Sequence, residues 1–161
     1  MNIFYLSNKP KEIAKQLCDK HIVKMPLESA QMLSSAWWSL PYEEMKHKIG
    51  KIYRPVHMGH PSTIWTYTAR ENYLWHYELF KEMLSEYSRR YNKVHKSSEL
   101  LEALAECPLK EGAFTEPPQC MPDEYKCDDT ITAYRQYYIG DKTRFAKYAY
   151  GPTPTWLEEY V

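Results

Sequence analysis

The chain has 161 residues and carries 21 Lys and Arg side chains against 21 Asp and Glu, so its formal net charge at pH 7 is zero. This balance excludes a polycationic nucleic-acid arm and an acidic tail protein. Aromatic residues make up 15% of the chain, which supplies enough apolar bulk for the core of one domain. With only five glycines, the chain has no G-x-G-x-x-G or G-x-x-x-x-G-K-[ST] motif, which excludes Rossmann and P-loop sites.

Neither a membrane span nor a secretory signal is expected. The apolar runs fall far short of the roughly 18 residues of a span, and Ile3–Leu6 is too short for the core of a signal peptide. We therefore expect a soluble, cytoplasmic protein. The four cysteines lack C-x-x-C spacing and predict free thiols. No cofactor is predicted, although a catalytic divalent metal stays open, as does a structural zinc site that would use His57, His60, Cys120 and Cys127.

The N-terminal part of the chain predicts two helices. Ile3–Leu6 fits either an edge strand or an extended lead-in. A first helix follows, with Ser7 or Asn8 as its cap and Pro10 in its first turn. A second helix is expected over residues 19–40, with Pro26 as a kink or a break. Its apolar positions at helical spacing are Ile22, Val23, Leu27, Ala30, Leu33 and Trp37.

The rest of the chain also predicts helices. Residues 41–60 predict a loop with at most a short helix, and a long helical pattern runs from Pro61 to about Asn92. Ser97-Ser98 is the predicted cap of another helix. Residues 108–128 contain four prolines and predict a long ordered loop. Asp128 or Asp129 caps a last helix, which an aromatic tail follows.

The predicted fold class is therefore mainly α, with a long ordered Pro-rich loop and at most one short N-terminal strand. A single compact domain is expected over residues 1–161. We divide it into a helical core over about 10–107, the loop over 108–128, and the C-terminal helix and aromatic tail over 129–161.

The zero net charge hides two unequal parts. Residues 99–129 hold nine acids and two bases, a net charge of −7, so the rest of the chain carries +7. This asymmetry is compatible with a basic surface for a polyanion and a separate acidic segment. A solvated acidic helix is the alternative interpretation.

The segment Cys18–Gln31 is the richest in candidate catalytic groups. Imidazole, ammonium and carboxylate groups within reach of one another can share protons and bind phosphates. An exposed face with ordinary Glu–Lys pairs is the alternative. The predicted polar stripe of the helix consists of His21, Lys24, Glu28 and Gln31. The candidate acid–base groups of the segment are Asp19, His21 and Glu28, and Lys20 and Lys24 are the candidate phosphate ligands.

A second cluster surrounds the helix start at Pro61. Free backbone N–H groups there favour an anion, with His60 beside them. Asn72 lies at helical spacing from Trp65 and Trp75, an arrangement that could hold a base between aromatic rings. A capped helix with tryptophans in the core is the alternative.

A third cluster lies in and after the Pro-rich loop. Prolines stiffen the chain, so the loop would display Asp123, a second candidate carboxylate, and Lys126, a candidate ligand of the substrate. Tyr134 and Arg135 then combine an aromatic ring with a cation, which suits phosphates and stacked bases. A buried tyrosine face with surface bases is the alternative.

Together these segments resemble a known family. The motifs are Cys18–Met25 with Glu28–Gln31, His60-Pro61 before Trp65, Asn72-Tyr73-x-Trp75, Met121–Lys126 and Ala133-Tyr134-Arg135-x-Tyr137-Tyr138. They resemble a family of small proteins encoded by tailed bacteriophages and, more loosely, the phage enzymes that modify DNA pyrimidines. The resemblance spans almost the whole chain and implies a phage origin and the cytoplasm of the infected cell. No catalytic residue of those enzymes is carried over.

We therefore expect an enzyme that acts on a nucleobase or nucleotide, with DNA as the favoured partner and no membrane partner. Group transfer to a pyrimidine and glycosylase-type chemistry both fit the candidate groups. Two alternatives stay open. One is a non-enzymatic protein that binds a host protein through its acidic segment, and the other is a metal-dependent phosphodiesterase, for which no D-x-D or H-x-H-x-D-H motif is present.

Overall fold

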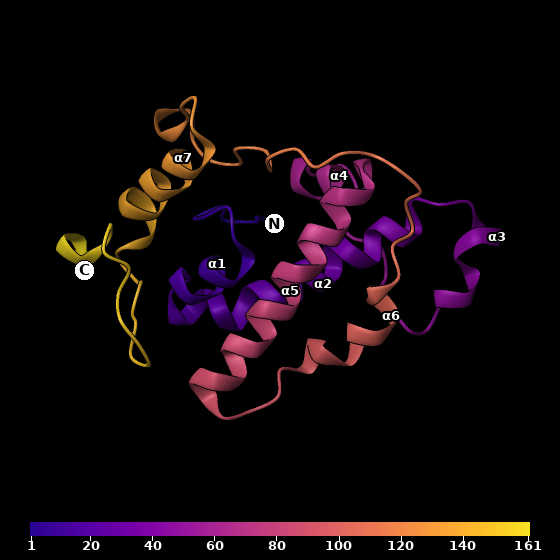
Figure 1. Ribbon diagram of the computed structural model, residues 1–161, viewed down its shortest axis with the longest axis horizontal. Helices are drawn as coiled ribbons and strands as arrows, with labels where there is room; N and C mark the ends of the chain where they lie inside the picture. The colour runs from indigo at the N-terminus through magenta and orange to yellow at the C-terminus, as the bar shows by residue number, and fades with distance from the viewer.

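Two long helices that cross form the centre of the fold. The computed structural model describes residues 1–161. It contains seven α-helices and no strand, which confirms the predicted α fold. α2 and α5 pack against each other, α1 lies against α5, and α4 lies against α2, as Figure 1 shows. The α-helices are α1 (Pro10–Gln16), α2 (Asp19–Trp38), α3 (Tyr42–Met45), α4 (Pro61–Thr68), α5 (Arg70–Tyr91), α6 (Leu101–Ala105) and α7 (Thr130–Tyr137).

Short helical turns complete the secondary structure. Four are 3₁₀ turns: η1 (Lys46–Lys48), η2 (Lys96–Leu100), η3 (Asp123–Tyr125) and η5 (Glu158–Tyr160). The fifth, η4 (Tyr138–Lys142), is a π turn that continues α7. None of the helices combines the length and the apolar character that a membrane span requires.

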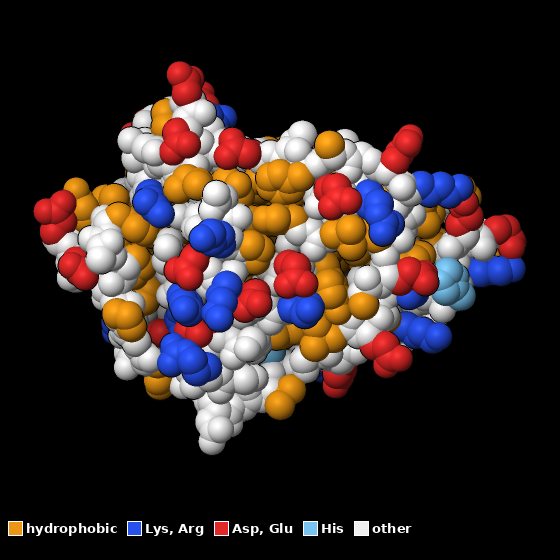
Figure 2. All heavy atoms as spheres, viewed as in Figure 1, with side chains coloured by type: hydrophobic (Ala, Val, Ile, Leu, Met, Phe, Trp, Pro, Cys, Tyr) orange, Lys and Arg blue, Asp and Glu red, His pale blue; other side chains and the backbone are white.

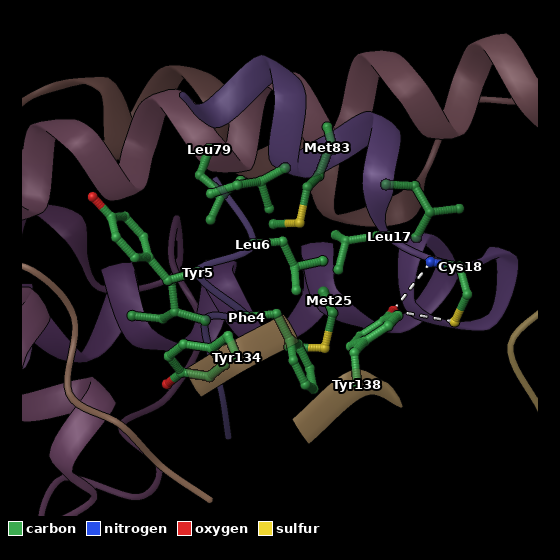
Figure 3. Packing of buried hydrophobic residues seen from close by; sticks show 14 of the residues in the cluster. Phe4, Tyr5, Leu6, Leu17, Cys18, Met25, Leu79, Met83, Tyr134 and Tyr138 are labelled. Carbon is green, nitrogen blue, oxygen red and sulfur yellow. Dashed lines mark hydrogen bonds between the residues drawn. The ribbon is translucent and has the colours of Figure 1, made fainter. Parts of the chain in front are cut away.

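The N-terminal segment is an extended lead-in, so the alternative of an edge strand is wrong. All four side chains of Ile3–Leu6 are at most 5% exposed, and they lie between α1, α5 and α7 (Figure 3). Phe4 has a φ of +41°, a left-handed conformation that a bulky residue rarely adopts. It turns the chain so that no ladder with another strand forms.

α2 continues through Pro26 without a break, as one helix of 20 residues. Its inner face differs from the prediction at two positions, because Val23 is 44% and Leu27 is 40% exposed. Helices pack on α2 from the opposite side, where Ile22, Ala30 and Leu33 are fully buried. A sequence of small and apolar residues nearly all around a helix leaves its buried face undetermined.

The predicted long helix from Pro61 is two helices, because the backbone of Ala69 is extended. The freed N–H groups of Arg70 and Glu71 donate to the carbonyls of Glu111 (2.9 Å) and Gly112 (3.1 Å). Gly112 has a φ of +120°, and a Cβ there would lie 2.6 Å from the Cβ of Ala69. The break thus depends on a loop distant in sequence, which no local pattern indicates.

Helix caps were predicted correctly in one of three places. Asp129 accepts a hydrogen bond from Thr132 N at 2.9 Å at the start of α7. α1 instead starts after Lys9, which provides no side-chain cap, so Ser7 and Asn8 are wrong. The turn η2 starts at His95, whose ring accepts from Ser97 N at 3.0 Å, rather than at Ser97-Ser98.

The long loop and the tail are ordered by contacts with the helical core. The loop over residues 108–128 passes across α4 on its way to α7 (Figure 1), and Trp65 Nε1 donates to the carbonyl of Thr115 at 3.0 Å. In the tail, Trp156 is half-buried and donates to Gln16 Oε1 at 3.2 Å, so this aromatic docks the tail against α1. Figure 2 shows acidic and basic side chains interspersed on one face of the molecule.

A buried ionic cluster joins α5 to the start of α2. Arg90 is 7% exposed and donates to Glu86 Oε2 at 2.7 Å, to Asp19 Oδ1 at 3.1 Å and to the carbonyl of Ala14 at 3.2 Å. Burial alone would raise the pKa of Glu86, but hydrogen bonds from Arg89 and Arg90 outweigh it and hold the pKa below its ordinary value. Every charge in the cluster therefore has a partner, as buried charges require.

Glu86→Gln is expected to lower the free energy of unfolding by about 3 kcal/mol, because the buried Arg90 loses the charge that compensates it. Glu78→Gln on the same helix is the matched control, since Glu78 pairs with Lys81 at an exposed position and should cost under about 1 kcal/mol. Urea denaturation of both variants measures the difference. Equal losses would show that the cluster contributes no more than a surface pair.

Candidate functional site

An amine and a carboxylate meet where the N-terminal segment reaches α2. The backbone nitrogen of Met1, a free ammonium group in the structure, lies 3.4 Å from Glu28 Oε1. The side chains of the two residues are 3% exposed for Met1 and 11% exposed for Glu28, and Met1 as a whole residue is half-buried. An ion pair beside two mostly buried side chains is screened less than a pair on the open surface, which strengthens the attraction between the two groups.

A second amine approaches the same carboxylate. Lys24 Nζ lies 3.5 Å from Glu28 Oε2, one turn earlier on α2, and its side chain is 63% exposed. Glu28 therefore contacts the Met1 amine through one oxygen and the Lys24 amine through the other. The predicted proximity of Lys24 and Glu28 is confirmed, whereas the Met1 amine was missed.

His60, the N-cap residue of α4, lies near this pair. Its Nδ1 accepts a hydrogen bond from Ser62 N at 3.1 Å. Burial lowers the pKa of His60, the positive Met1 amine and His57 lower it further, and Glu28 opposes them. The charges of the Met1 amine and of Glu28 therefore both act on the ring. Its Nδ1 is already occupied as the acceptor of the capping hydrogen bond.

Basic side chains over aromatic rings extend from α2 towards η4. Lys142 Nζ lies 4.6 Å from the ring centre of Tyr137, and Lys20 Nζ lies 4.7 Å from that of Phe145. The guanidinium of Arg144 lies 5.4 Å from the same Phe145 ring. We call Lys20, Lys24, Lys142 and Arg144 the basic surface. Such cations over aromatic rings can hold phosphates beside a flat apolar group.

His21 is buried beneath this basic surface. The residue is 6% exposed, its ring stacks on Phe4 with centres 4.5 Å apart, and its Nδ1 lies 2.6 Å from the hydroxyl of Tyr138. Burial, with help from Lys142, Lys24 and Lys20, lowers the pKa of His21 to about 3. The expected stripe that joins His21 to Lys24, Glu28 and Gln31 is wrong at His21, because the ring points into the core.

A comparison of the sequence with protein-family models decides the family. The model of the pyrimidine dimer DNA glycosylases matches residues 1–99, more than half of the chain. The chain belongs to the pyrimidine dimer DNA glycosylase family. No curated protein and no solved structure matches it. The matched part contains Met1, Glu28 and the helices α1 to α5, whereas α6, the Pro-rich loop and α7 lie beyond it.

In this member of the family, several of the predicted site residues form hydrogen bonds or ion pairs that hold the fold together. Asp19 accepts from Arg90 and, at 2.8 Å, from Ala149 N, so its carboxylate joins the tail to α2. It makes no hydrogen bond with His21, and the predicted pairing of the two is wrong. Gln31 is half-buried, one turn beyond Glu28 on α2.

The second predicted cluster of this glycosylase-family chain forms part of its framework. Asn72 is 1% exposed, donates to the carbonyl of Trp65 at 3.0 Å and accepts from Thr115 N at 2.9 Å. Trp65 is 7% exposed, and half-buried Trp75 packs against Tyr5. Asn72 and Trp65 are therefore engaged with the chain itself, which matches the alternative of a capped helix with core tryptophans.

The third predicted cluster is dispersed. Asp123 is 96% exposed and pairs with Lys126 at 2.9 Å. Tyr134 is fully buried, and Arg135 Nε donates to the carbonyl of Leu6 at 3.1 Å. The structure therefore separates Asp123 from Glu28, and it gives Tyr134 and Arg135 partners within the fold. No group of three His, Cys, Asp or Glu side chains is arranged to hold a metal ion.

The Met1 amine has no signature in the residue letters, since every chain has a first residue. The available signal was indirect: Ile3–Leu6 is a fully apolar run beside the first residue, so its burial fixes residue 1 as well. Neither Met1 nor Glu28 lines any of the larger cavities. One of about 710 Å³ is lined by residues that include Lys48 and Glu106, and one of about 470 Å³ includes Arg90 and Tyr148.

Replacing His21 by Gln should flatten the acid limb of the stability profile. The folded state keeps His21 neutral down to a pKa of about 3, whereas an unfolded chain binds that proton from about pH 6.5. The unfolded state thus binds more protons between these values, so wild-type stability falls as the pH is lowered, by up to about 1.4 kcal/mol per pH unit from His21. Urea denaturation at pH 6 and pH 4 should show a steeper loss for the wild type. Parallel losses would contradict burial of a neutral ring.

Proposed function

We propose that this protein is a DNA glycosylase that breaks the glycosidic bond of a pyrimidine dimer, with the Met1 amine as nucleophile and Glu28 as its acid–base partner. The observation that carries the proposal is the 3.4 Å contact between the amine and Glu28, within the part of the chain that matches the family. An amine beside a carboxylate is the pairing that covalent catalysis at a sugar carbon needs.

The chemistry follows from these two groups. Glu28 takes a proton from the ammonium, and the freed lone pair of the nitrogen attacks C1′ of the sugar. The bond between C1′ and the pyrimidine N1 breaks, its electron pair leaves on N1, and N1 takes up one of the two protons that remain on the attacking nitrogen. Glu28 then returns its proton to O4′ as the sugar ring opens, which leaves a C1′–nitrogen imine.

An α-amine suits this task better than a lysine. The ordinary pKa of an α-amino group is about 8, against about 10.4 for a lysine side chain, so more of it is neutral and nucleophilic at pH 7. Lys24 is the second candidate nucleophile, because its Nζ also contacts Glu28. The two assignments differ in which residue becomes attached to DNA.

The other predicted reactions have less support. No observation favours a transferase, and the acidic segment remains only a predicted surface for a host protein. A phage origin and a cytoplasmic location likewise stay predictions. The basic surface supports DNA as the partner, since it places cations beside the Met1–Glu28 pair on the shared helix α2.

Borohydride should trap a covalent complex between the protein and a duplex oligonucleotide that contains one pyrimidine dimer, because it reduces the imine to a stable amine. Peptide mapping should place the DNA on residue 1. An extension of Gly-Ser before Met1 converts the amine into an amide and should abolish trapping, while the same extension at the C-terminus should leave it unchanged. DNA mapped to Lys24 would reject the Met1 assignment, and the absence of any complex would reject the proposed function.

Glu28→Gln should lower the single-turnover rate by about 100-fold or more, because the amine loses the group that takes its proton. Glycosidic cleavage is measured as alkali-labile strand breaks, since the freed base stays tied to its neighbour in the dimer. Glu78→Gln is the matched control, because Glu78 is an exposed carboxylate on α5 that pairs with Lys81, and it should change the rate far less. A rate for Glu28→Gln within about threefold of wild type would contradict an acid–base role.

Lys20→Gln and Lys142→Gln should each weaken DNA binding and reduce the slope of log K against log salt by about one, as expected for the loss of a phosphate contact. Lys81→Gln serves as the control, because Lys81 is an exposed lysine on α5 away from the basic surface. Fluorescence anisotropy at several salt concentrations provides the slopes. Unchanged slopes for both variants would show that DNA lies on another face.

A further inference from the structure

The side chain of Asn2 is bonded in two directions next to the proposed nucleophile. Its Oδ1 accepts hydrogen bonds from Ile3 N at 2.7 Å and Phe4 N at 3.3 Å. Its Nδ2 donates to the carbonyl of Cys120 at 2.9 Å, across 118 residues of sequence. The residue is 9% exposed. Asn2 thus forms a turn within the N-terminal segment and attaches that turn to the Pro-rich loop.

The loop is itself held by three helices. We call residues 115–121 the anchor loop. Thr115 is bonded to Asn72 on α5 and to Trp65 on α4. The hydroxyl of Tyr134 on α7 accepts from Cys120 N at 3.2 Å and donates to the carbonyl of Pro118.

A further contact joins the anchor loop to the start of α4. The sulfur of Cys120 lies 3.4 Å from Ser62 Oγ, and the N–H of Ser62 is the donor that binds His60. These contacts hold the carbonyl of Cys120 in place. The hydrogen bond from Asn2 to this carbonyl in turn holds the N-terminal segment.

The Met1 side chain packs against the core, and the hydrogen bonds of Asn2 fix the direction of the backbone beside it. The apolar burial of Ile3–Leu6 holds the chain on the C-terminal side of Asn2. Residue 1 must lie near that segment, because adjacent Cα atoms are only 3.8 Å apart, but this spacing does not set the direction of its amine. Phe4 also adopts its left-handed conformation while Asn2 Oδ1 binds its N–H, and strain of this kind persists only where surrounding contacts hold it. A misplacement of a reacting group by about 1 Å can cost a factor of about 100 in rate.

We infer that Asn2 is a positioning residue that holds the Met1 amine against Glu28, and that the anchor loop, outside the part of the chain matched to the family, completes the site. This inference rests on the proposed function for its catalytic consequence. It also makes a claim about the amine that is independent of catalysis, namely that the bond to the anchor loop keeps the amine in contact with Glu28.

The catalytic arm compares wild type with Asn2→Leu, which keeps a similar bulk and removes both polar atoms. The single-turnover rate of borohydride trapping on dimer-containing duplex DNA should fall about tenfold or more. The dissociation constant for the same DNA should stay within about twofold, because the basic surface is untouched. Intact mass confirms that residue 1 is the same in both proteins.

The second arm measures the amine directly. Brief acylation with a soluble succinimidyl ester, followed by peptide mass spectrometry, gives the labelling rate of residue 1 relative to the exposed Lys81 as an internal standard. The wild-type amine, which Glu28 contacts at 3.4 Å, should label slowly, and Asn2→Leu should label at least about fivefold faster. This readout needs no substrate and no activity.

Tyr134→Phe tests the anchor loop itself, since it removes the hydroxyl that binds Pro118 and Cys120. It should speed labelling of residue 1 in the same direction, and it keeps the inference testable if Asn2→Leu does not fold. Tyr77→Phe is its matched control, because Tyr77 donates one hydroxyl bond to the carbonyl of Leu101 away from the site and should change nothing.

The outcomes separate the two claims. Unchanged labelling in both folded variants overturns the positioning role, whatever the activity. Faster labelling with an unchanged trapping rate overturns the catalytic part of the inference. A wild type that labels slowly but never forms a trapped complex rejects the proposed function alone, and the anchoring of the amine is then still judged by the labelling arm.

Discussion

The burial of four consecutive side chains at the N-terminus is the constraint on which the rest of the structure depends. Ile3–Leu6 fills the space between α1, α5 and α7, and Figure 3 shows Phe4, Tyr5 and Leu6 surrounded by side chains from distant parts of the chain. Apolar burial of this kind is non-directional, so it fixes where the segment lies but not how its first residue points. The direction comes from polar bonds, chiefly those of Asn2.

Polar groups inside the protein serve mainly to connect elements. His76 is fully buried and bridges Thr66 on α4 and Ser29 on α2, and burial lowers its pKa to about 3. Arg90 on α5 likewise joins α2 through the carboxylate of Asp19 and α1 through the backbone carbonyl of Ala14. The helices that carry the candidate site are therefore locked by specific bonds, and this rigidity preserves a short contact between catalytic groups.

Much of the fold follows from patterns within single segments, and the site does not. The helices α2 and α7, the cap at Asp129 and the ordered loop were predicted from local spacing, because such signals act over one or two turns. The break at Ala69 escaped prediction because its cause is Gly112, far along the chain. The amine at residue 1 escaped for a similar reason, since only tertiary packing brings it to Glu28. The candidates that failed to meet, such as Asp123 and Asp19, were grouped by chemical type without knowledge of their partners.

The hydroxyl of Tyr138 determines what His21 can do. It accepts the N–H of Cys18 at 3.1 Å, and its single hydrogen can serve either His21 Nδ1 at 2.6 Å or the sulfur of Cys18 at 3.3 Å. The much shorter contact favours the imidazole, whose Nδ1 is then an acceptor. A neutral ring in that state carries its hydrogen on Nε2, so it can offer a hydrogen bond to an incoming anion but has no lone pair free to take up a proton.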